Sequence, residues 1–524
     1  MSMRKEAYFE NSEHFGVARL RRNSRLGGLK MGSNERITVD VPAGSFSIRK
    51  TDLLGADQVP IETKARTWGI YALSATWFAI VIAIADFMIF SGSVLAGLSF
   101  WQTVLAFTIG TAIVALVFWV NGSMGANYGV NHTVQLRLAF GNKAGAYIAS
   151  GLRAIIALIW FGVNSWIATL AIDSILTSAS GWENLAMWPR WIVIFVAVSI
   201  LQALIVLRGY RGVKLLETWG APILVAVIGA AVVWMFSSVG SLGPFFEAGT
   251  EYTQWGSFDV FVSAGIMIAI GNWWTMAFNA SDFTRVAKSN KHVGWTFFVF
   301  FMLAYLVCGF LAVGSMSMSL EQGLGLMWNP VDYFSLFPST PVAILLLVLV
   351  AVSCFTTNPP ANIFSPATTL TNIVRRKLSF AKAGAIMAMA TVFTCPWLIL
   401  ARPESLLAWV TNYGSALGAL IGVMLTDWLV FRRRGKQLDL AELYEPDGRY
   451  KYWKGGINWV AIGSAAVAVP VAFLMFNGTY SVLLSTVVAG GVYVVAMKAL
   501  QKRNRVVQLA ISPQGSGQGK VEAR

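Results

Sequence analysis

The stretch Gly265–Arg285, GIMIAIGNWWTMAFNASDFTR, begins like a membrane-spanning helix but carries many polar side chains. Its middle reads GNWWT at Gly271–Thr275, and its end contains Asn279, Asp282 and Arg285. A polar side chain costs free energy in hydrocarbon unless it is paired. Irregular backbone persists at membrane depth only where protein or a water-filled cavity covers it. The stretch therefore indicates either a helix that is unwound or tightly packed around a binding site, or a helix–helix packing seam with Asp282 and Arg285 paired at the membrane surface.

The composition of the whole chain excludes a soluble globular protein. Hydrophobic residues make up 56% of the 524 residues, and charged residues only 12%. Apolar runs of about 20 residues recur, and each is long enough to cross about 30 Å of hydrocarbon. Cys308, Cys354 and Cys395 lie within these runs, so they indicate neither disulfides nor a metal site. We find no nucleophile–base pair and no metal-ligand spacing, which argues against an enzyme.

The apolar segments and the basic loops between them predict a membrane topology. Twelve segments lie at about 68–91, 99–120, 145–176, 190–207, 219–238, 257–280, 293–316, 341–372, 381–400, 404–431, 457–476 and 480–499. Lysine and arginine gather in the loops after the even-numbered segments, whereas the alternate loops hold little beyond Arg190 and Arg402. Because basic loops stay in the cytoplasm, this asymmetry predicts a multi-pass protein of the cell membrane with both termini in the cytoplasm. The formal charge of +15 then reflects topology and does not indicate nucleic-acid binding.

Asp86 is an acidic residue near the middle of the first segment, in AIADFMIF. An ionised carboxylate at this depth is costly unless it meets a cation, a partner or water. It is either a satisfied structural carboxylate or a functional group that faces a cavity. Arg153 is expected to snorkel to the inner interface and Arg285 to lie on the cytoplasmic side, so neither is an easy partner. A sodium ion, a proton and an amine-bearing substrate all remain open as the compensating charge. His132, in the loop after the second segment, is expected to be an ordinary interfacial histidine.

Two further segments carry polar residues on one helix face. Trp160 and Asn164 are four residues apart, so they share a face of the third segment and offer a flat π surface beside an amide. This pairing suits a planar heterocycle with ring N–H and C=O groups. Asn358 and Asn362 share a face of the eighth segment in the same way. Trp166 points elsewhere and is expected to be a packing residue.

The eighth segment contains SCFTTNPPAN at Ser353–Asn362. Pro359 and Pro360 remove two backbone donors and leave two carbonyls of the preceding turn without their usual partners. Together with the hydroxyls of Thr356 and Thr357, these carbonyls could form an oxygen cage for a small hard cation. The alternative is a plain proline kink that threonine back-bonding closes.

Five motifs in register resemble the nucleobase:cation symporter-1 family, from about residue 64 to about residue 476. They are RTWG at 66–69, WFGVNSW at 160–166, NASDFTR at 279–285, TTNPPAN at 356–362, and the series DWLVFRRR at 427–434, DLAELY at 439–444, GRYKY at 448–452 and GGINW at 455–459.

The resemblance implies an all-α polytopic membrane protein with twelve transmembrane helices. Ten of them would form a LeuT-type core of two inverted five-helix repeats, and two would follow at the C-terminal end. Helices one and six would be broken near the midplane, with helices three and eight facing them. The expected division is a basic cytoplasmic tail without core residues at 1–65 (although Ile37–Ile48 could pair as a short strand), the transport core at 66–432, a cytoplasmic loop at 433–456, two additional helices at 457–500 and a disordered cytoplasmic tail at 501–524.

The implied activity is secondary active symport of a planar nitrogen heterocycle. The family carries purines, cytosine, uracil, allantoin, hydantoins and vitamin precursors together with sodium or protons, and needs no cofactor. The expected partners are the heterocycle, the coupling cation and the lipid bilayer. A second hypothesis is a substrate-sensing transceptor of the same fold, which would signal through the basic N-terminal tail.

The resemblance also assigns roles to individual positions. Trp160 and Trp273 match the stacking tryptophans, and Asn362 matches a substrate-binding asparagine. Asn164 stands where many relatives have glutamine, and its shorter side chain leaves the identity of the ring open. Asp86 lies where many relatives have a proline-containing break, and is a candidate to bind a basic substrate group or the coupling proton. The sodium site would use the backbone carbonyls of Val81 and Ile84 and the helix-eight residues Ser353, Thr356 and Thr357.

Overall fold

The computed structural model describes most of the chain between residues 36 and 510. The described residues are 36–55, 58–180, 182–207, 233, 237, 243–247, 258–325, 327–374, 378–432, 438–504, 506, 507 and 510. The apolar segment predicted at 219–238, except residues 233 and 237, lies outside them, as do residues 1–35 and 511–524 of the two predicted tails.

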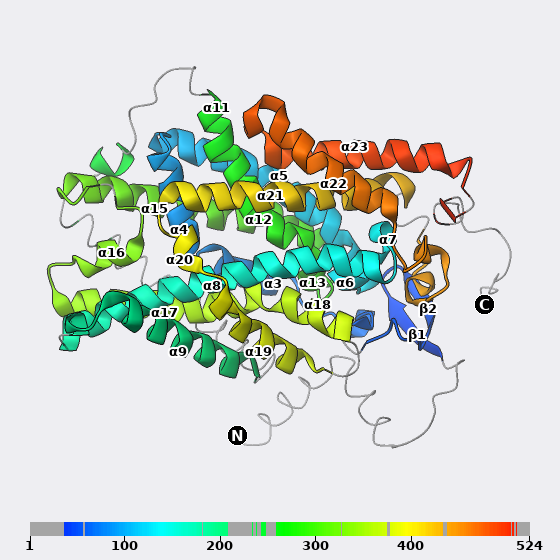
Figure 1. Ribbon diagram of the computed structural model, residues 1–524, viewed down its shortest axis with the longest axis horizontal. Helices are drawn as coiled ribbons and strands as arrows, with labels where there is room; N and C mark the ends of the chain where they lie inside the picture. The colour runs from blue at the N-terminus through cyan, green and yellow to red at the C-terminus, as the bar shows by residue number, and fades with distance from the viewer. Residues whose placement is uncertain are drawn as a thin grey trace.

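The described chain is a bundle of long helices that run roughly along one axis (Figure 1). Nine of its helices are long and apolar enough to cross a membrane, and one bent helix pair adds a further candidate span. The principal helices are α3 (Ile70–Val81), α4 (Ile84–Leu95), α5 (Phe100–Tyr128), α8 (Ala144–Ser180), α9 (Met187–Leu207), α12 (Met267–Phe278), α15 (Met302–Glu321), α17 (Thr340–Asn362), α18 (Phe364–Val374), α21 (Pro403–Thr426), α22 (Trp459–Leu474) and α23 (Ser481–Gln501).

Outward-facing apolar side chains match a lipid environment. Leu105, Leu303 and Val495 are each more than half exposed on the long helices. Exposed apolar surface of this extent is rare on soluble monomers and typical of membrane contact. The segment expected at 381–400 is represented by the shorter helix α19 (Phe380–Ala390). The full count of twelve transmembrane helices therefore stays a prediction, while a membrane domain built of helices is confirmed.

The first predicted segment is a broken helix. α3 ends at Val81, α4 begins at Ile84, and the two halves meet at a bend of 57°. Ile82 and Ala83 leave the helical conformation between them. Asp86 lies in the first turn of α4, where the helix dipole favours a negative charge. The predicted break in helix one is therefore present without a proline.

The GNWWT sequence lies inside a regular helix. Gly271–Thr275 belongs to α12, so the expectation of unwinding there is wrong. The break comes later, at Asn279, which separates α12 from the short helix α13 (Ala280–Thr284). Gly271 instead allows close packing against α21. The two helices are so near that a Cβ added at Gly414 of α21 would lie only 2.8 Å from the Cα of Gly271. The alternative of a tightly packed helix is the one that the structure supports.

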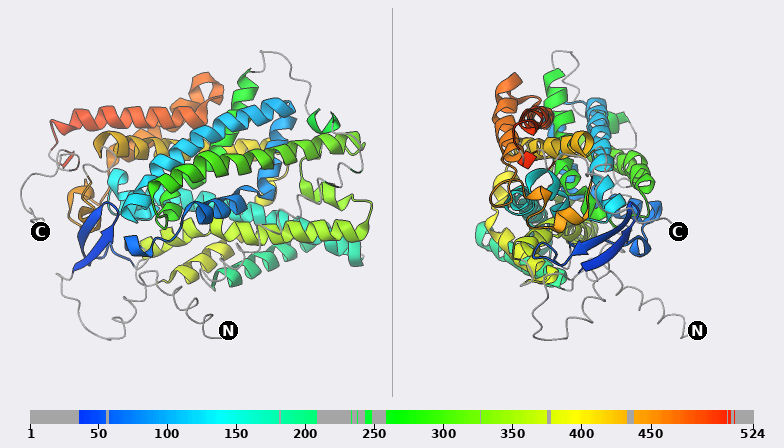
Figure 2. Two further views of the ribbon diagram at one scale, coloured as in Figure 1. Left: turned by 180° about the vertical axis from the view of Figure 1, so that it is seen from behind. Right: turned by 90° about the vertical axis from the view of Figure 1, so that its right-hand side faces the viewer.

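A β-hairpin covers one end of the bundle (Figures 1 and 2). Strands β1 (Arg36–Val41) and β2 (Gly44–Arg49) pair antiparallel, with Ile37 opposite Ile48. The prediction of a strand at 37–48 is confirmed. Val39, Val41 and Ile48 are buried, so the expectation of a tail without core residues is wrong from residue 36 onward.

The loop after the tenth span lies at the same end and is folded. Tyr444 and Tyr450 are fully buried in it, and Glu445 pairs with Arg49 of β2 at 2.5 Å. Seen along the bundle, this loop and the hairpin lie on the same end of the molecule (Figure 2, right). Ala510 is also buried, and its carbonyl accepts a hydrogen bond from Arg432. The predicted disorder over 501–524 is therefore wrong at this position.

Candidate functional site

A cavity lies where the break between α3 and α4 meets α8, α12 and α17. Its wall contains all five residues predicted to bind substrate, which come from four different helices. They are Asp86, Trp160, Asn164, Trp273 and Asn362. The structure thus brings together residues that are up to 276 positions apart in the sequence.

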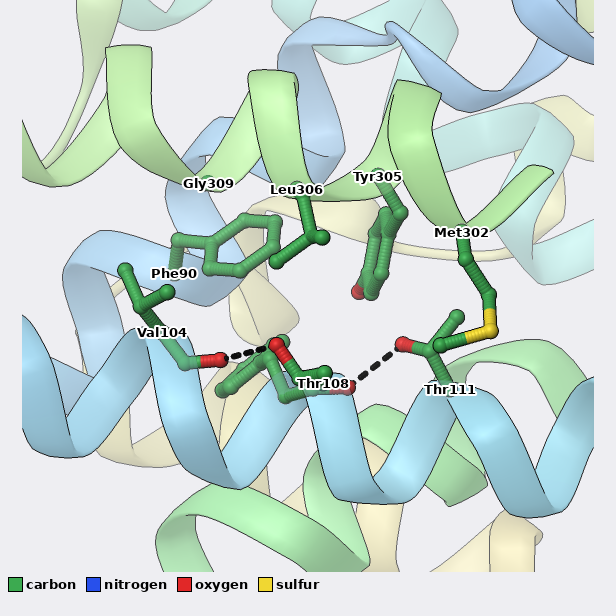
Figure 3. A pocket seen from close by; sticks show the side chains of 9 residues that line it. Phe90, Val104, Thr108, Thr111, Met302, Tyr305, Leu306 and Gly309 are labelled. Carbon is green, nitrogen blue, oxygen red and sulfur yellow. Dashed lines mark hydrogen bonds between the residues drawn. The ribbon is translucent and has the colours of Figure 1, made fainter. Parts of the chain in front are cut away.

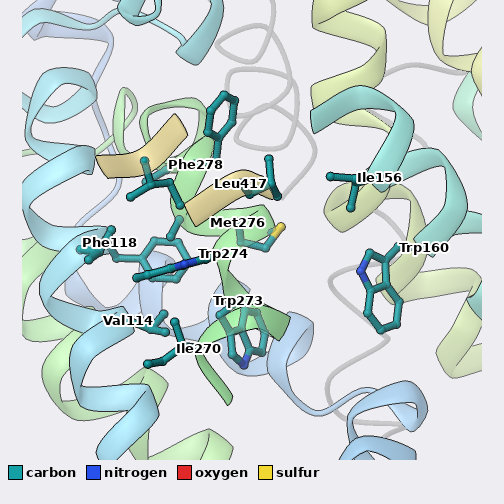
Figure 4. Close-up of a cluster of buried hydrophobic side chains, with 14 of the residues drawn as sticks. Val114, Phe118, Ile156, Trp160, Ile270, Trp273, Trp274, Met276, Phe278 and Leu417 are labelled. Carbon is teal, nitrogen blue, oxygen red and sulfur yellow. The ribbon is translucent and has the colours of Figure 1, made fainter. Parts of the chain in front are cut away.

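Two indoles supply the aromatic part of the wall. Figure 4 shows Trp160 on α8 standing apart from Trp273 on α12. Edge contacts hold both rings: Trp273 packs against Phe301 at 4.9 Å and Tyr305 at 5.5 Å, and Trp160 against Tyr413 at 6.1 Å between ring centroids. Neither indole Nε1 has a hydrogen-bond partner among the described residues. Both residues line the cavity, so their rings offer aromatic surface to a ligand.

A chain of amides fixes the asparagines on α8 and α17. Asn164 donates from Nδ2 to the carbonyl of Trp160 at 3.0 Å, which confirms their shared face. Asn362 donates to Asn358 Oδ1 at 3.0 Å, and Asn358 donates to Gln202 Oε1 at 3.0 Å. Gln202, on α9, was missed in the sequence, although a glutamine within an apolar run was a usable signal. These contacts give the asparagines fixed orientations at the cavity wall.

A hydrogen bond from Asn272, a partner that the sequence did not predict, holds the Asp86 side chain in place. Asn272 donates from Nδ2 to Asp86 Oδ1 at 2.6 Å and to the Tyr305 hydroxyl at 3.2 Å. Asp86 is 7% exposed and lines the cavity. In the part of the chain that the structure describes, no cationic side chain forms an ion pair with it. The carboxylate is therefore buried, oriented and without a compensating charge from the described protein.

A smaller cavity lies behind this group, between α4, α5 and α15 (Figure 3). The Tyr305 ring extends from α15 toward α5, across from Thr108 and Thr111. Both threonine hydroxyls donate to carbonyls of their own helix, at 2.7 and 2.6 Å. The space is thus mostly apolar, and the Tyr305 side chain contributes to its wall while its hydroxyl contacts Asn272 beside the larger cavity.

Arg153 does not snorkel to the interface, so that prediction is wrong. It is fully buried, and its Nε donates to the Thr275 carbonyl at 2.5 Å and to Asn279 Oδ1 at 3.2 Å. The reason is the break in helix six: the Asn279 N–H bonds to Ala277, which leaves the Thr275 carbonyl without its usual helical donor. Arg153 satisfies that carbonyl and ties α8 to the end of α12.

The residues proposed for sodium come from neighbouring helices. Val81 and Ile84 flank the helix break, and the other three lie on α17, which contacts both α3 and α4. The hydroxyls of Thr356 and Thr357 donate to the Ser353 carbonyl at 2.9 and 3.0 Å. This is the threonine back-bonding that the alternative interpretation described, although α17 continues as a helix through both prolines. Ser353 Oγ is buried, and no described residue gives it a hydrogen bond.

His132 is a buried partner of Asp282, so the expectation of an interfacial histidine is wrong. Its Nδ1 lies 2.7 Å from Asp282 Oδ2, and its backbone N–H donates to Oδ1 at 2.9 Å. Burial alone would raise the pKa of Asp282. The interactions with His132 and the charge of Arg285 outweigh burial and hold the pKa of Asp282 below its usual value. The polar end of the opening stretch thus anchors α13 to the loop after α5.

Known proteins share both the sequence pattern and this architecture. Residues 60–496 match the family described as permease for cytosine/purines, uracil, thiamine, allantoin. The hydantoin permease of Microbacterium maritypicum is 30% identical over 441 residues, which cover 80% of this chain and 84% of that protein. The inward-facing structure of Mhp1 superposes with a TM-score of 0.75 at 28% identity, over 89% of this chain and 99% of Mhp1. Mhp1 in a closed conformation with bromovinylhydantoin bound, described as a nucleobase-cation-symport-1 family transporter, gives a TM-score of 0.71 at 28% identity, over 87% and 97%. This chain therefore belongs to the cytosine/purine, uracil, thiamine and allantoin permease family, the nucleobase:cation symporter-1 transporters, and it is a LeuT-type membrane transporter and not an enzyme.

Proposed function

We propose that the protein imports a planar nitrogen heterocycle across the cell membrane by alternating access, coupled to sodium or protons. The observation that carries the proposal is the cavity wall that joins Trp160, Trp273, Asn164 and Asn362. Aromatic faces bind a flat ring by stacking, and oriented amides bind its polar edge. Relatives support the same class, because they include a hydantoin permease and an Mhp1 structure with bromovinylhydantoin bound.

A cation site beside the helix break is consistent with this activity. In folds with inverted repeats, coupling ions bind where discontinuous helices free backbone carbonyls. The Val81 carbonyl lies at the break and accepts from the Ala83 N–H at 3.0 Å, which leaves one of its lone pairs for an ion. The buried Ser353 hydroxyl on α17 lacks a hydrogen-bond partner among the described residues. The oxygens of Thr356 and Thr357 keep lone pairs after they donate their hydrogens. These features favour sodium as the ion at this site, with the proton as the alternative.

The orientation follows from the end of the bundle that carries the hairpin. The basic residues Arg137 and Arg432 are buried beside the folded loop 438–456, and Arg137 donates to the carbonyls of Leu443 and Leu53. Because basic loops stay in the cytoplasm, we assign this end to the cytoplasm. Both termini of the chain then face the cytoplasm.

Uptake into proteoliposomes tests the proposed function. Radiolabelled hydantoin, allantoin, uracil, cytosine and purines are supplied with a sodium gradient, a proton gradient or neither. We expect one class of ring to accumulate above its external concentration only when a gradient is imposed. A ring that binds but never accumulates would favour the transceptor, and a protein that binds none of them would refute the assignment.

A further inference from the structure

We propose that Asp86 and Asn272 form a specificity-determining pair that selects a ring with two adjacent N–H donors on one edge. Such an edge is a ring N–H next to an exocyclic amino group, as in an amidinium or a cyclic guanidine. The inference rests on the proposed function, because it refines which ring enters the cavity beside Trp160 and Trp273.

The orientation of Asn272 is the first step. Its amide nitrogen lies 2.6 Å from Asp86 Oδ1 and 3.2 Å from the Tyr305 hydroxyl. A carboxylate can only accept, so the amide must turn its nitrogen toward Asp86. Both hydrogens of that nitrogen are then in use. What Asn272 offers to the cavity is its carbonyl oxygen, a pure acceptor.

The second step is the open oxygen of Asp86. Its Oδ1 accepts from Asn272, while Oδ2 has no hydrogen bond from any described residue. Both residues line the same cavity. With Asp86 ionised, this part of the wall presents two acceptors, one of them charged. A ligand edge with two N–H donors satisfies both, as a guanidinium does with a carboxylate.

The opposite part of the wall is different. Asn164 and Asn362 each use one amide hydrogen, toward Trp160 and Asn358 respectively, and each keeps an oxygen and a second hydrogen. They can therefore meet either C=O or N–H groups. Selection between amino and oxo rings falls to the Asp86–Asn272 pair. A ring that turned C=O toward it would place acceptor against acceptor in a water-poor cavity, which is strongly disfavoured.

Tyr305 acts as a positioning residue for this pair. Its ring is packed against Phe90 at 4.8 Å between ring centroids (Figure 3). Its hydroxyl accepts from Asn272, and its ring also contacts Trp273 at 5.5 Å. Tyr305 therefore fixes the orientation of the Asn272 amide, although Tyr305 itself is not part of the wall of the larger cavity. Loss of the hydroxyl frees Asn272 to rotate, and so should weaken selectivity more than it weakens ring binding.

Matched ring pairs test the inference on the purified full-length protein in lipid nanodiscs. Isocytosine and uracil differ by an amino group in place of an oxo group, and guanine and hypoxanthine differ by one amino group. Affinities are measured by quenching of tryptophan fluorescence. We expect the amino member of each pair to bind at least tenfold more tightly. In Asp86→Asn the ratio should fall to about threefold or less, and in Tyr305→Phe it should fall while uracil affinity changes little.

The outcomes separate the inference from the proposed function. If uracil and hypoxanthine bind the wild type as tightly as their amino partners, the inference is wrong and the proposed function stands, because planar rings still bind. A wild-type preference that Asp86→Asn leaves unchanged also overturns it. If no ring binds the folded wild type, both fail. Should Asp86→Asn not fold, Asn272→Ala replaces it, with the same loss of the ratio expected and an unchanged ratio counting against the pair.

Discussion

Asp86 and Asp427 are both buried carboxylates within membrane-spanning segments, but their surroundings differ. Asp427 is 1% exposed and accepts from Arg432 at 3.0 and 3.2 Å and from the Tyr493 hydroxyl at 3.0 Å. Asp86 accepts from an amide alone and lines a cavity. A charge that the protein has neutralised and hydrogen-bonded is structural, whereas one left without a counter-charge is held for a ligand or an ion. We therefore expect disruption of the Asp427 ion pair to lower stability, and loss of the Asp86 charge to impair transport.

The largest expected effect is a loss of stability when the Asp427–Arg432 ion pair is broken. Arg432→Met should destabilise the fold by about 3–5 kcal/mol, because it leaves the Asp427 carboxylate buried without its cation. Thermal unfolding in detergent measures this. The matched change in the cavity is Asp86→Asn, which removes a charge that has no cationic partner among the described residues. It should leave the midpoint temperature of thermal unfolding unchanged or raise it. Equal losses of stability in the two variants would show that the two carboxylates do not differ in their structural role.

Asp86→Asn should instead lose function. If the carboxylate binds the substrate, the variant should lose uptake of amino-bearing rings more than it loses uptake of oxo rings. If it carries the coupling proton, binding and exchange should persist while pH-driven accumulation disappears. Uptake at the wild-type rate across substrate, sodium and pH series would make Asp86 a structural residue and remove it from the site.

Stacking comes next in size. Trp273→Ala should cost about 1–3 kcal/mol of binding free energy, the range for base–aromatic stacking, which is roughly tenfold or more in affinity. Trp273→Phe should retain part of it. Trp166 is the control on the neighbouring helix α8, since it packs against Trp191 at 5.6 Å and Trp397 at 5.3 Å as its predicted packing role requires. Trp166→Phe should leave the affinity unchanged, and a loss equal to that of Trp273→Phe would count against the cavity.

The sodium residues should give a selective and smaller effect. Ser353→Ala and Thr357→Ala remove oxygens near the helix break, so we expect weaker stimulation of uptake by sodium with normal insertion into the membrane. Thr368 of α18 is the control, because its hydroxyl makes the same kind of bond to its own helix, at 2.8 Å, but Thr368 is not part of the cavity wall to which Thr357 belongs. If wild-type uptake is indifferent to sodium at fixed pH, the site is wrong and the proton becomes the coupling ion.

The weakest effect concerns the anchor of α13. The pKa of Asp282 is lower in the folded protein than its usual value, so its contribution to stability is present above that usual value and is lost as the pH falls through the folded pKa. Asp282→Asn should therefore destabilise the protein at neutral pH and flatten the acid limb of its stability profile. An acid limb identical to that of the wild type would show that the His132 contact contributes nothing.

The sequence predicted the residues of the cavity wall better than the residues that hold them in position. Trp160, Asn164 and Asn362 were identifiable because polar or aromatic groups at helical spacing are conspicuous within apolar runs. Tyr305 gave no such signal, since a tyrosine in an apolar helix is ordinary until packing sets its direction. Arg153 was misplaced for a related reason. Its buried position depends on the carbonyl freed by the break at Asn279, whereas the glycine and small polar residues at Gly271–Thr275 had suggested a break further upstream.

The ends of the chain were the other source of error. Apolar and polar side chains alternate at Ile37, Val39 and Val41, so the pattern predicted a strand but did not show what its apolar face packs against. The hairpin is buried against a loop more than 390 residues away: the Thr51 hydroxyl, just after it, donates to the Tyr444 carbonyl at 2.6 Å. Such contacts depend on distant parts of the chain, and a local pattern does not identify those partners.

An experimental structure with the tightest-binding heterocycle tests the different roles of Asp86 and Asp427. We expect the ring to lie between Trp160 and Trp273, with an N–H edge within hydrogen-bond distance of an Asp86 oxygen and Arg432 still paired with Asp427. A ring bound elsewhere, or an Asp86 carboxylate neutralised by a protein cation while the cavity holds substrate, would contradict this expectation.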